Sequence, residues 1–358
     1  MSEKYFLGAM TQHGFSTEFG KLIENADYYT YILKGGAGTG KSSLMKKVAA
    51  EFEPSEHVTR FYCSSDPNSL DAVVLNSSKV IVVDGTSPHV FDPIYPGACQ
   101  KIVNLGEFWD SENLKAHKDE IIDVTDRNKS MLARAKRFGT ALSNVCYDTY
   151  FCGASCVMTE KLEAFMERFR KRILTKKGAG TGKKTVRQLT ALTENGYMAW
   201  TETLESYLDT YYLADDYYVC ANLIIQSVAN EAVRRGFDVI LCPSVAFNND
   251  VYEHLLIPEI GVALVSCSPL IDIEHSQSSK TINLVRFYDK DKLSIFKARL
   301  RLNKITAKNI SQEIYSTIKN AKKIHDEIEK FYISSMDFDT INKIGDDIIK
   351  EIKALKKV

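Results

Sequence analysis

The sequence predicts an α/β protein in which one open, mostly parallel sheet with flanking helices occurs twice, and each copy is followed by a long helical hairpin. Three observations predict this fold. They are an internal repeat spaced by about 180 residues, a strand, glycine loop and helix pattern near the N-terminus, and long runs of helical periodicity after each repeat. Strands that alternate with helices are typical of parallel sheets.

Four segments of the first half recur in the same order in the second half. The pairs are AMTQHGF and ALTENGY (from Ala9 and Ala191), KKVAAEFE and QSVANEAV, VTRFYCSS and DVILCPSV, and IVNLGEFWD and TINLVRFYD (from Ile102 and Thr281). Repeats of this kind indicate duplicated structural units. We therefore predict a first core at 1–110, a helical hairpin at 111–176, a basic linker with glycines at 177–186, a second core at 187–289 and a helical region at 290–358.

The composition is that of an ordinary globular protein with a sizeable core. The chain has 358 residues, 44% of them hydrophobic, and its formal net charge is zero, so the chain as a whole does not attract polyanions. No stretch approaches the roughly 20 apolar residues that cross a bilayer, and the N-terminus has no targeting pattern, so we expect a cytoplasmic protein without a membrane segment. The eight cysteines lack zinc-type spacing and are expected to be free thiols.

A glycine loop lies between a predicted strand, DYYTYILK, and a predicted helix, SSLMKKVAAEFE. Residues 35–42 fit the P-loop pattern G-x-x-x-x-G-K-[ST] at every fixed position. In such a loop the backbone N–H groups surround phosphates, the lysine reaches the β- and γ-phosphates, and the hydroxyl residue binds Mg²⁺. The predicted nucleotide-binding residues are Gly35, Gly36, Ala37, Gly38, Thr39, Gly40, Lys41, Ser42 and Ser43.

Asp84 is the predicted second Mg²⁺ ligand, beside Ser42. It ends the apolar run from Val80 to Val83, which is typical of a buried strand. The next residue is Gly85, so the adjacent water-activating glutamate of many ATPases is missing. Only one strand is expected between the glycine-loop strand and the Asp84 strand, which leaves the strand order open. No guanine-reading N-K-x-D element follows, so ATP with Mg²⁺ is the expected ligand.

Three further polar residues follow predicted strands of the first core. Asp66, His89 and Asp92 are expected at the carboxyl ends of strands, where open α/β sheets bind ligands. Each is a candidate for orienting water or accepting a proton, although each is also common in turns and caps. The candidate catalytic residues are therefore Lys41, Asp84, His89 and Asp66, with Asp92 as a further candidate.

The second core is predicted to be degenerate. Its counterpart of the glycine loop, near Val219 to Asn222, has neither glycine nor lysine, and Ser266 stands in place of Asp84. Approximate counterparts of Asp66 and His89 are Val245 and Ile271. A second GAGTGK motif starts at Gly178, but no strand precedes it and Lys184 replaces the hydroxyl residue, so we interpret it as a linker, with a small anion-binding nest as the alternative.

Two regions are candidates for partners other than ATP. From Arg168 to Arg187 there are nine Lys or Arg and no acid, which predicts either a solvated basic stretch or a patch for an anionic partner. The helical regions after each core carry apolar stripes, for example Ile310, Ile314 and Ile318. We expect each to fold back on its own core or on its counterpart, while a protein partner or an intermolecular coiled coil is the alternative.

The motifs AMTQHGF, GGAGTGKSS, DPNSLD and VVDGTSPHVFDP in tandem cores resemble an uncharacterised family of duplicated P-loop ATPases from spore-forming, clostridia-like bacteria. The resemblance covers nearly the whole chain. It implies that Gly35 to Ser42 bind ATP and that Asp84 serves the metal. The missing glycine loop of the second copy departs from what the resemblance implies and argues against a two-site mechanism.

Together these observations predict a slow, Mg²⁺-dependent ATPase with one nucleotide site in the first core. Two other functions remain open at the level of sequence. One is a phosphotransferase, in which Asp66, His89 or Asp92 lies near an acceptor hydroxyl. The other is a nucleotide-gated binding module with negligible turnover, which the missing glutamate at position 85 favours.

Overall fold

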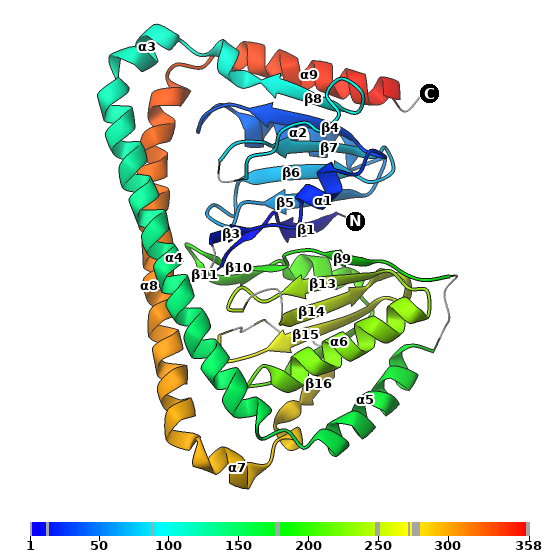
Figure 1. Ribbon diagram of the computed structural model, residues 1–358. Helices are drawn as coiled ribbons and strands as arrows, with labels where there is room; N and C mark the ends of the chain where they lie inside the picture. Colours follow the sequence, from blue (N-terminus) through cyan, green and yellow to red (C-terminus); the bar gives the residue numbers. More distant parts are fainter. Residues whose placement is uncertain are drawn as a thin grey trace.

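The computed structural model describes residues 2–11, 14–87, 89–175, 180–247, 251–270, 273 and 280–355. In this part of the chain two six-stranded sheets are each joined to long helices (Figure 1). The first sheet has the order β1-β5-β6-β7-β4-β8, with β1 (Glu3–Phe6), β4 (Tyr29–Lys34), β5 (Val58–Tyr62), β6 (Leu70–Leu75), β7 (Val80–Asp84) and β8 (Gln100–Asn104). A hairpin of β2 (Ala9–Thr11) and β3 (Gly14–Ser16), and the helices α1 (Gly20–Ile23) and α2 (Lys41–Phe52), complete the first core.

The second sheet repeats this strand order, as the sequence repeat predicts. It runs β9-β13-β14-β15-β12-β16, with β9 (Lys184–Val186), β12 (Asp209–Ala214), β13 (Val239–Pro243), β14 (Tyr252–Ile257), β15 (Val262–Cys267) and β16 (Lys280–Asn283). The hairpin of β10 (Thr190–Thr193) and β11 (Gly196–Ala199) matches β2 and β3, and α6 (Val219–Arg234) matches α2. In the described part of the chain, short 3₁₀ turns lie between these elements at Leu105–Phe108, Thr201–Ser206, Pro258–Ile260 and Leu284–Phe287.

Strand register supports the correspondence between the halves, and the strand count corrects one expectation. Leu33 of β4 pairs with Asp84 of β7, and Leu213 of β12 pairs with Ser266 of β15, so Ser266 takes the place of Asp84 as predicted. Two strands, β5 and β6, separate β4 from β7 in sequence, where one was expected, because the apolar run around Asp71 forms a strand of its own. That strand is antiparallel to both of its neighbours.

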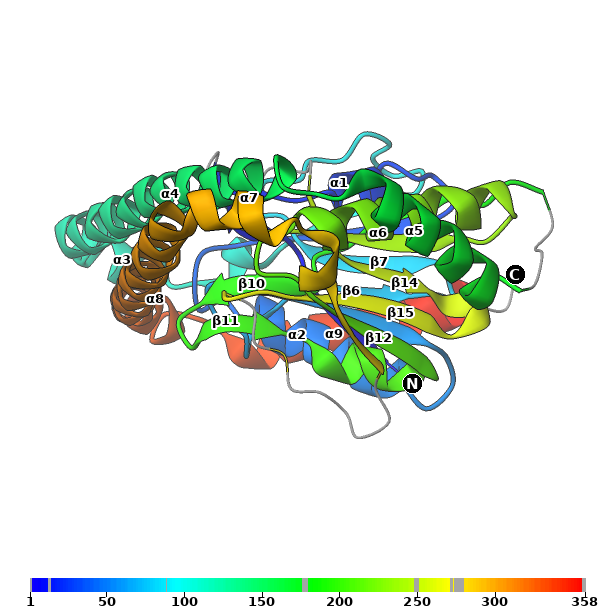
Figure 2. The same cartoon turned by 90° about the horizontal axis from the view of Figure 1, so that it is seen from below.

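The two helical regions pack on each other, which is one of the two arrangements expected from the sequence, and each ends on the core opposite to the one at which it begins. After α3 (Ser111–Ala116), the 37-residue helix α4 (Lys118–Ala154) runs from the first core to the second, where α5 (Thr159–Ile173) packs on α6. After α7 (Lys290–Ile295), the 37-residue helix α8 (Lys297–Ile333) returns to the first core, where α9 (Phe338–Leu355) packs on α2. Figures 1 and 2 show α4 and α8 side by side along one flank of both sheets.

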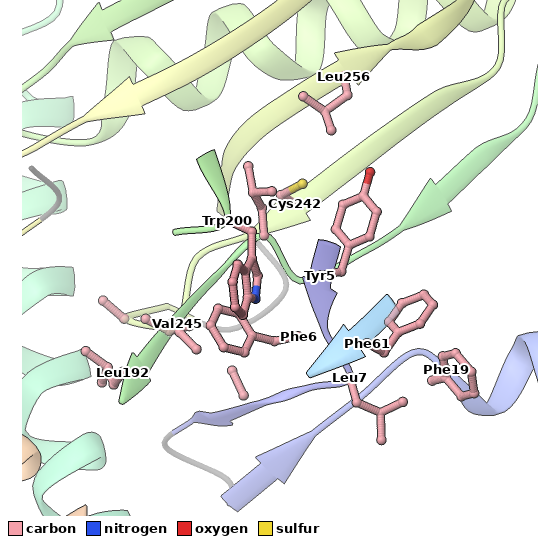
Figure 3. Close-up of a cluster of buried hydrophobic side chains, with 14 of the residues drawn as sticks. Tyr5, Phe6, Leu7, Phe19, Phe61, Leu192, Trp200, Cys242, Val245 and Leu256 are labelled. Atoms are coloured by element: carbon pink, nitrogen blue, oxygen red, sulfur yellow. The ribbon is translucent and has the colours of Figure 1, made fainter. Parts of the chain in front are cut away.

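The two cores also contact each other directly at the edges of their sheets. The N–H of Phe6 in β1 donates to the carbonyl of Gln188 at 2.7 Å, and the rings of Phe6 and Tyr62 lie 5.5 and 4.3 Å from that of Trp200. Figure 3 shows Phe6 and Trp200 in one buried cluster with Tyr5 and Cys242. The hydrophobic effect therefore holds the halves together as a single unit.

We predict that helix α9 stabilises the first core although it is more than 300 residues from β4 in sequence. Ile348 is 2% exposed and packs in the cluster around β4 and α2. Replacing it with alanine should cost about 2–5 kcal/mol of unfolding free energy, because a buried aliphatic side chain is lost and a cavity remains. The measurement is urea unfolding of Ile348→Ala beside Lys350→Ala, an exposed change on the same helix. Equal midpoints for the two variants would contradict the packing of α9 on the first core.

Candidate functional site: the glycine loop beneath helix α8

The glycine loop connects β4 to α2, at the carboxyl edge of the first sheet. Gly38 and Gly40 have φ angles of 68° and 86°, a left-handed conformation that favours glycine. Gly40 is the residue directly before α2, so the first N–H groups of this helix face the loop. The strand, loop and helix predicted from the sequence are therefore present, with β4 at Tyr29–Lys34 and α2 at Lys41–Phe52.

Lys41 is folded back over the loop and is only 8% exposed. Its Nζ donates to the carbonyl oxygens of Gly35 and Gly36 at 3.1 and 2.6 Å, and it lies 3.6 Å from Oδ2 of Asp84. The hydroxyl of Thr39, also buried, donates to the Gly36 carbonyl at 2.9 Å. The loop thus places a cation at its centre, where it can meet phosphate oxygens.

Ser42, in the first turn of α2, and Asp84, at the end of β7, are the two residues that were expected to bind a metal ion. Oδ1 of Asp84 accepts from the N–H of Thr86 at 2.9 Å, while Oδ2 faces Lys41. Oγ of Ser42 accepts from the N–H of Leu70 at 3.0 Å. Among the described residues no group of three or more His, Cys, Asp or Glu side chains suits a metal ion. One hydroxyl and one carboxylate fit another kind of site, in which Mg²⁺ is bound by these two side chains together with phosphate oxygens.

Asp71 and His89 form a buried pair beside this site. Nε2 of His89 lies 3.5 Å from Oδ2 of Asp71, and the two side chains are 7% and 5% exposed. Burial raises the pKa of Asp71. Burial also opposes the charged form of His89, but the contact with Asp71 and the charge of Asp84 outweigh it and raise the pKa of His89. Sequence analysis missed Asp71, although a carboxylate inside the apolar run SLDAVVL was a signal.

The other two predicted polar residues lie at the margin of the site. Asp66 forms an ion pair of 3.1 Å with Lys322 of α8, which also contacts Asp326 at 2.7 Å. Asp92 is mostly exposed and pairs with Lys34 at 2.8 Å. Only the fold brings Lys322 to Asp66, so nothing near either residue in the sequence predicted this pair.

The end of α8 lies directly against the glycine loop. A Cβ atom at Gly36 would come within 2.9 Å of the Tyr332 ring, and one at Gly38 would come within 2.9 Å of the Glu329 carbonyl oxygen. Ala37 packs on the cluster formed by α4 and α8. Since these helices begin in or end at the second core, the site in the first core has a wall made by elements that span both halves (Figure 1).

In the second core a carboxylate, Asp215, accepts hydrogen bonds at the N-terminus of α6. Asp215, only 2% exposed, follows β12 and accepts from the N–H of Ala221 in the first turn of α6 at 2.9 Å, and from the N–H of Tyr217 at 3.0 Å. The hydroxyl of Tyr288 also donates to it at 2.8 Å. Tyr218, at the position of Gly40, keeps the left-handed backbone with φ 66°. The helix N-terminus of this copy is thus satisfied by the protein itself.

The remaining counterparts carry no phosphate or metal chemistry in the described part of the second core. The register of β5 ends at Tyr62 and that of β13 at Pro243, so the match of Asp66 with Val245 stays a prediction. Ile271, the expected counterpart of His89, lies outside the described residues.

The second GAGTGK motif leads into a strand and not into a helix. Its residues 177–179, with Gly178, lie outside the described part. In the remainder, the N–H of Gly182 donates to the Val233 carbonyl at 3.0 Å and that of Lys183 to Asp238 at 2.7 Å. These two N–H groups already donate hydrogen bonds within the protein, which argues against a nest that binds phosphate there. The predicted linker 177–186 also ends in β9, an edge strand of the second sheet.

The basic stretch from Arg168 to Arg187 does not lie in one element. Its residues belong to α5, the linker and β9, and Arg187 directly follows β9. Arg170 bonds to Ser227, Lys171 pairs with Glu167, and the Arg172 guanidinium lies over the Phe169 ring at 5.2 Å. Arg187 stacks over Phe61 at the contact between the cores. Several of these cations thus have internal contacts, and they do not share one helix face.

Comparison with protein-family models, with curated proteins and with solved structures found no match to this chain. In the described residues no helix is long and apolar enough to span a membrane, and all eight cysteines are free. The site is therefore interpreted from its own geometry.

Glu253, the counterpart of Asp71 in the second core, makes a pH-dependent contribution to stability. It is 3% exposed and accepts hydrogen bonds from Ser244, Tyr197 and Thr190. Burial raises its pKa to about 7. Below its ordinary pKa of 4.5 this residue is protonated in both the folded and the unfolded chain. As the pH rises from there to about 7, only the unfolded chain loses the proton, so stability falls.

We predict that Glu253→Gln reduces this loss of stability by about 3 kcal/mol, because a neutral side chain has no proton to lose. The measurement is urea unfolding at a series of pH values from 4.5 to 7.5. Exposed Glu205→Gln serves as the control and should follow the native chain. If the native chain and Glu253→Gln show the same pH dependence, Glu253 does not titrate in the folded protein as described.

Proposed function

We propose that this protein binds ATP with Mg²⁺ at the glycine loop of its first core and hydrolyses it slowly, the second core being a degenerate copy of the same P-loop unit. The observation that carries the proposal is the position of Lys41. Its Nζ lies over the Gly35 and Gly36 carbonyls and 3.6 Å from Asp84, at the start of a helix whose N-terminus faces the loop. A cation, a carboxylate and free helix N–H groups together suit a phosphate chain with its metal.

Each residue of the site then has a defined part. The loop N–H groups bind phosphate oxygens, Lys41 leaves its carbonyl partners to contact the β- and γ-phosphates, and Ser42 and Asp84 hold Mg²⁺. Asp71 holds His89 in place at ion-pair distance, and His89 is a buried group suited to proton transfer. Slow turnover is expected because Gly85 stands where a water-activating glutamate would follow Asp84.

We predict that the native chain binds one fluorescent ATP analogue with Mg²⁺ per chain. Lys41→Ala should weaken binding by at least about tenfold, because one charge-assisted contact to phosphate is worth roughly 1.5–3 kcal/mol. Lys183→Ala, in the second GAGTGK motif, is the matched control and should bind like the native chain. The measurement is a fluorescence titration with stoichiometry. Two analogues per chain, or loss of binding in Lys183→Ala, would contradict the single-site proposal.

A second candidate function is a nucleotide-gated binding module with negligible turnover. The contact of Tyr332 and Glu329 with the glycine loop favours it, because a nucleotide entering the loop has to meet the end of α8. ADP formation separates the two candidates. ADP released by the native chain and not by Lys41→Ala supports hydrolysis, whereas binding without ADP release supports gating.

A phosphotransferase is the third candidate, and the His89–Asp71 pair favours it. A buried histidine held by a carboxylate can accept a proton from an acceptor hydroxyl as well as from water. Its signature is ATP consumption that rises with one particular acceptor. Consumption that stays constant across acceptors would leave hydrolysis as the reaction.

A further inference from the structure

A cavity of about 460 Å³ lies between the second core and the helices α4, α7 and α8, beside the counterparts of the glycine loop and of the residues after β7. Asp216, Tyr217 and Tyr218, which follow β12, line one side of it, and Pro269 and Leu270, which follow β15, line another. In open α/β sheets the carboxyl ends of parallel strands are where ligands bind. The volume is that of a small-molecule site.

The third wall of this cavity is strongly basic. Lys290 of α7 and Lys297, Arg301 and Lys304 of α8 line it, and all four are exposed at its mouth. None of the four has an ion pair within the described residues, whereas Arg299 on another face of α8 is paired with Asp148. Lys297, Arg301 and Lys304 are spaced by four and three residues and therefore share one face of the helix.

Two of the lining residues, Asn303 and Tyr217, are held by contacts within the protein. Asn303, 8% exposed, donates from Nδ2 to Asp148 at 2.6 Å and to Thr149 at 3.2 Å. Tyr217 presents a half-buried ring that is held edge-on by Tyr288 at 4.8 Å between ring centroids. Asp216 is the one acid among the lining residues, so four cations face a single carboxylate in the described part of the site.

We propose that this cavity binds a small phosphate-bearing molecule other than the ATP of the first core. Its phosphate lies against Lys297, Arg301 and Lys304, since a guanidinium and neighbouring ammonium groups bind phosphate oxygens by charge-assisted hydrogen bonds. The N-terminus of α6 is not the anchor, because Asp215 already occupies it. The second core has thus lost the phosphate loop of the first core but keeps a ligand site whose cations come from α7 and α8.

The test uses pyrophosphate as the probe, with the full chain carrying Lys41→Ala so that the glycine loop does not contribute. Isothermal titration calorimetry should show one pyrophosphate per chain. Adding Lys297→Glu and Arg301→Glu should weaken binding by at least about tenfold, since two favourable charges become unfavourable. The matched control adds Lys292→Glu and Lys308→Glu, which are exposed on the same two helices outside the cavity and change the net charge equally.

The control variant should bind within about twofold of its parent, which would place the site in the cavity. Two results would overturn the proposal: no pyrophosphate binding to the Lys41→Ala chain, or equal weakening by the two pairs of substitutions. Because the probe is measured without a functional glycine loop, failure of ATP binding in the first core would leave this test unaffected.

Discussion

The antiparallel packing of α4 on α8 is the contact on which the rest of the structure depends. Each helix begins beside one core and ends on the other, so α5 and α9 each pack on a core other than the one directly before them in sequence. Ion pairs such as Arg134 with Glu313 lie along the pair, but exposed ion pairs contribute little. Buried residues such as Ile314 and Ile318 supply the larger stabilisation.

The two cores have similar backbones, but they differ in the groups that lie at the N-termini of α2 and α6. In the first core, α8 closes over glycines that leave the N-terminus of α2 free for an anion. In the second core, Asp215 supplies the anion and Tyr218 keeps the left-handed conformation without the glycine. Such a conformation is unfavourable for a bulky residue and is tolerated because the surrounding packing fixes it. The second core therefore keeps the strand, loop and helix backbone of the first core without its glycine loop.

Local patterns in the sequence predicted the parts of the fold that depend on neighbouring residues. The glycine loop, the strand before Asp84 and the repeated order of elements belong to this group. Strand β6 was missed because Asp71 interrupts its apolar run, and that carboxylate is tolerated in the sheet because His89 pairs with it. Two contacts depend on where the 37-residue helix α8 ends, which periodicity alone does not determine. They are the ion pair of Lys322 with Asp66 and the packing of Tyr332 against Gly36.

We propose that the glycine loop binds ATP in contact with the end of α8. Amide hydrogen exchange with and without Mg²⁺-ATP tests it most directly, since exchange reports local opening of backbone hydrogen bonds. We expect slower exchange at both 35–43 and 329–341 in the native chain, and no change in Lys41→Ala. Unchanged exchange at 35–43 would contradict the nucleotide site. Slower exchange at 35–43 alone would contradict its coupling to α8.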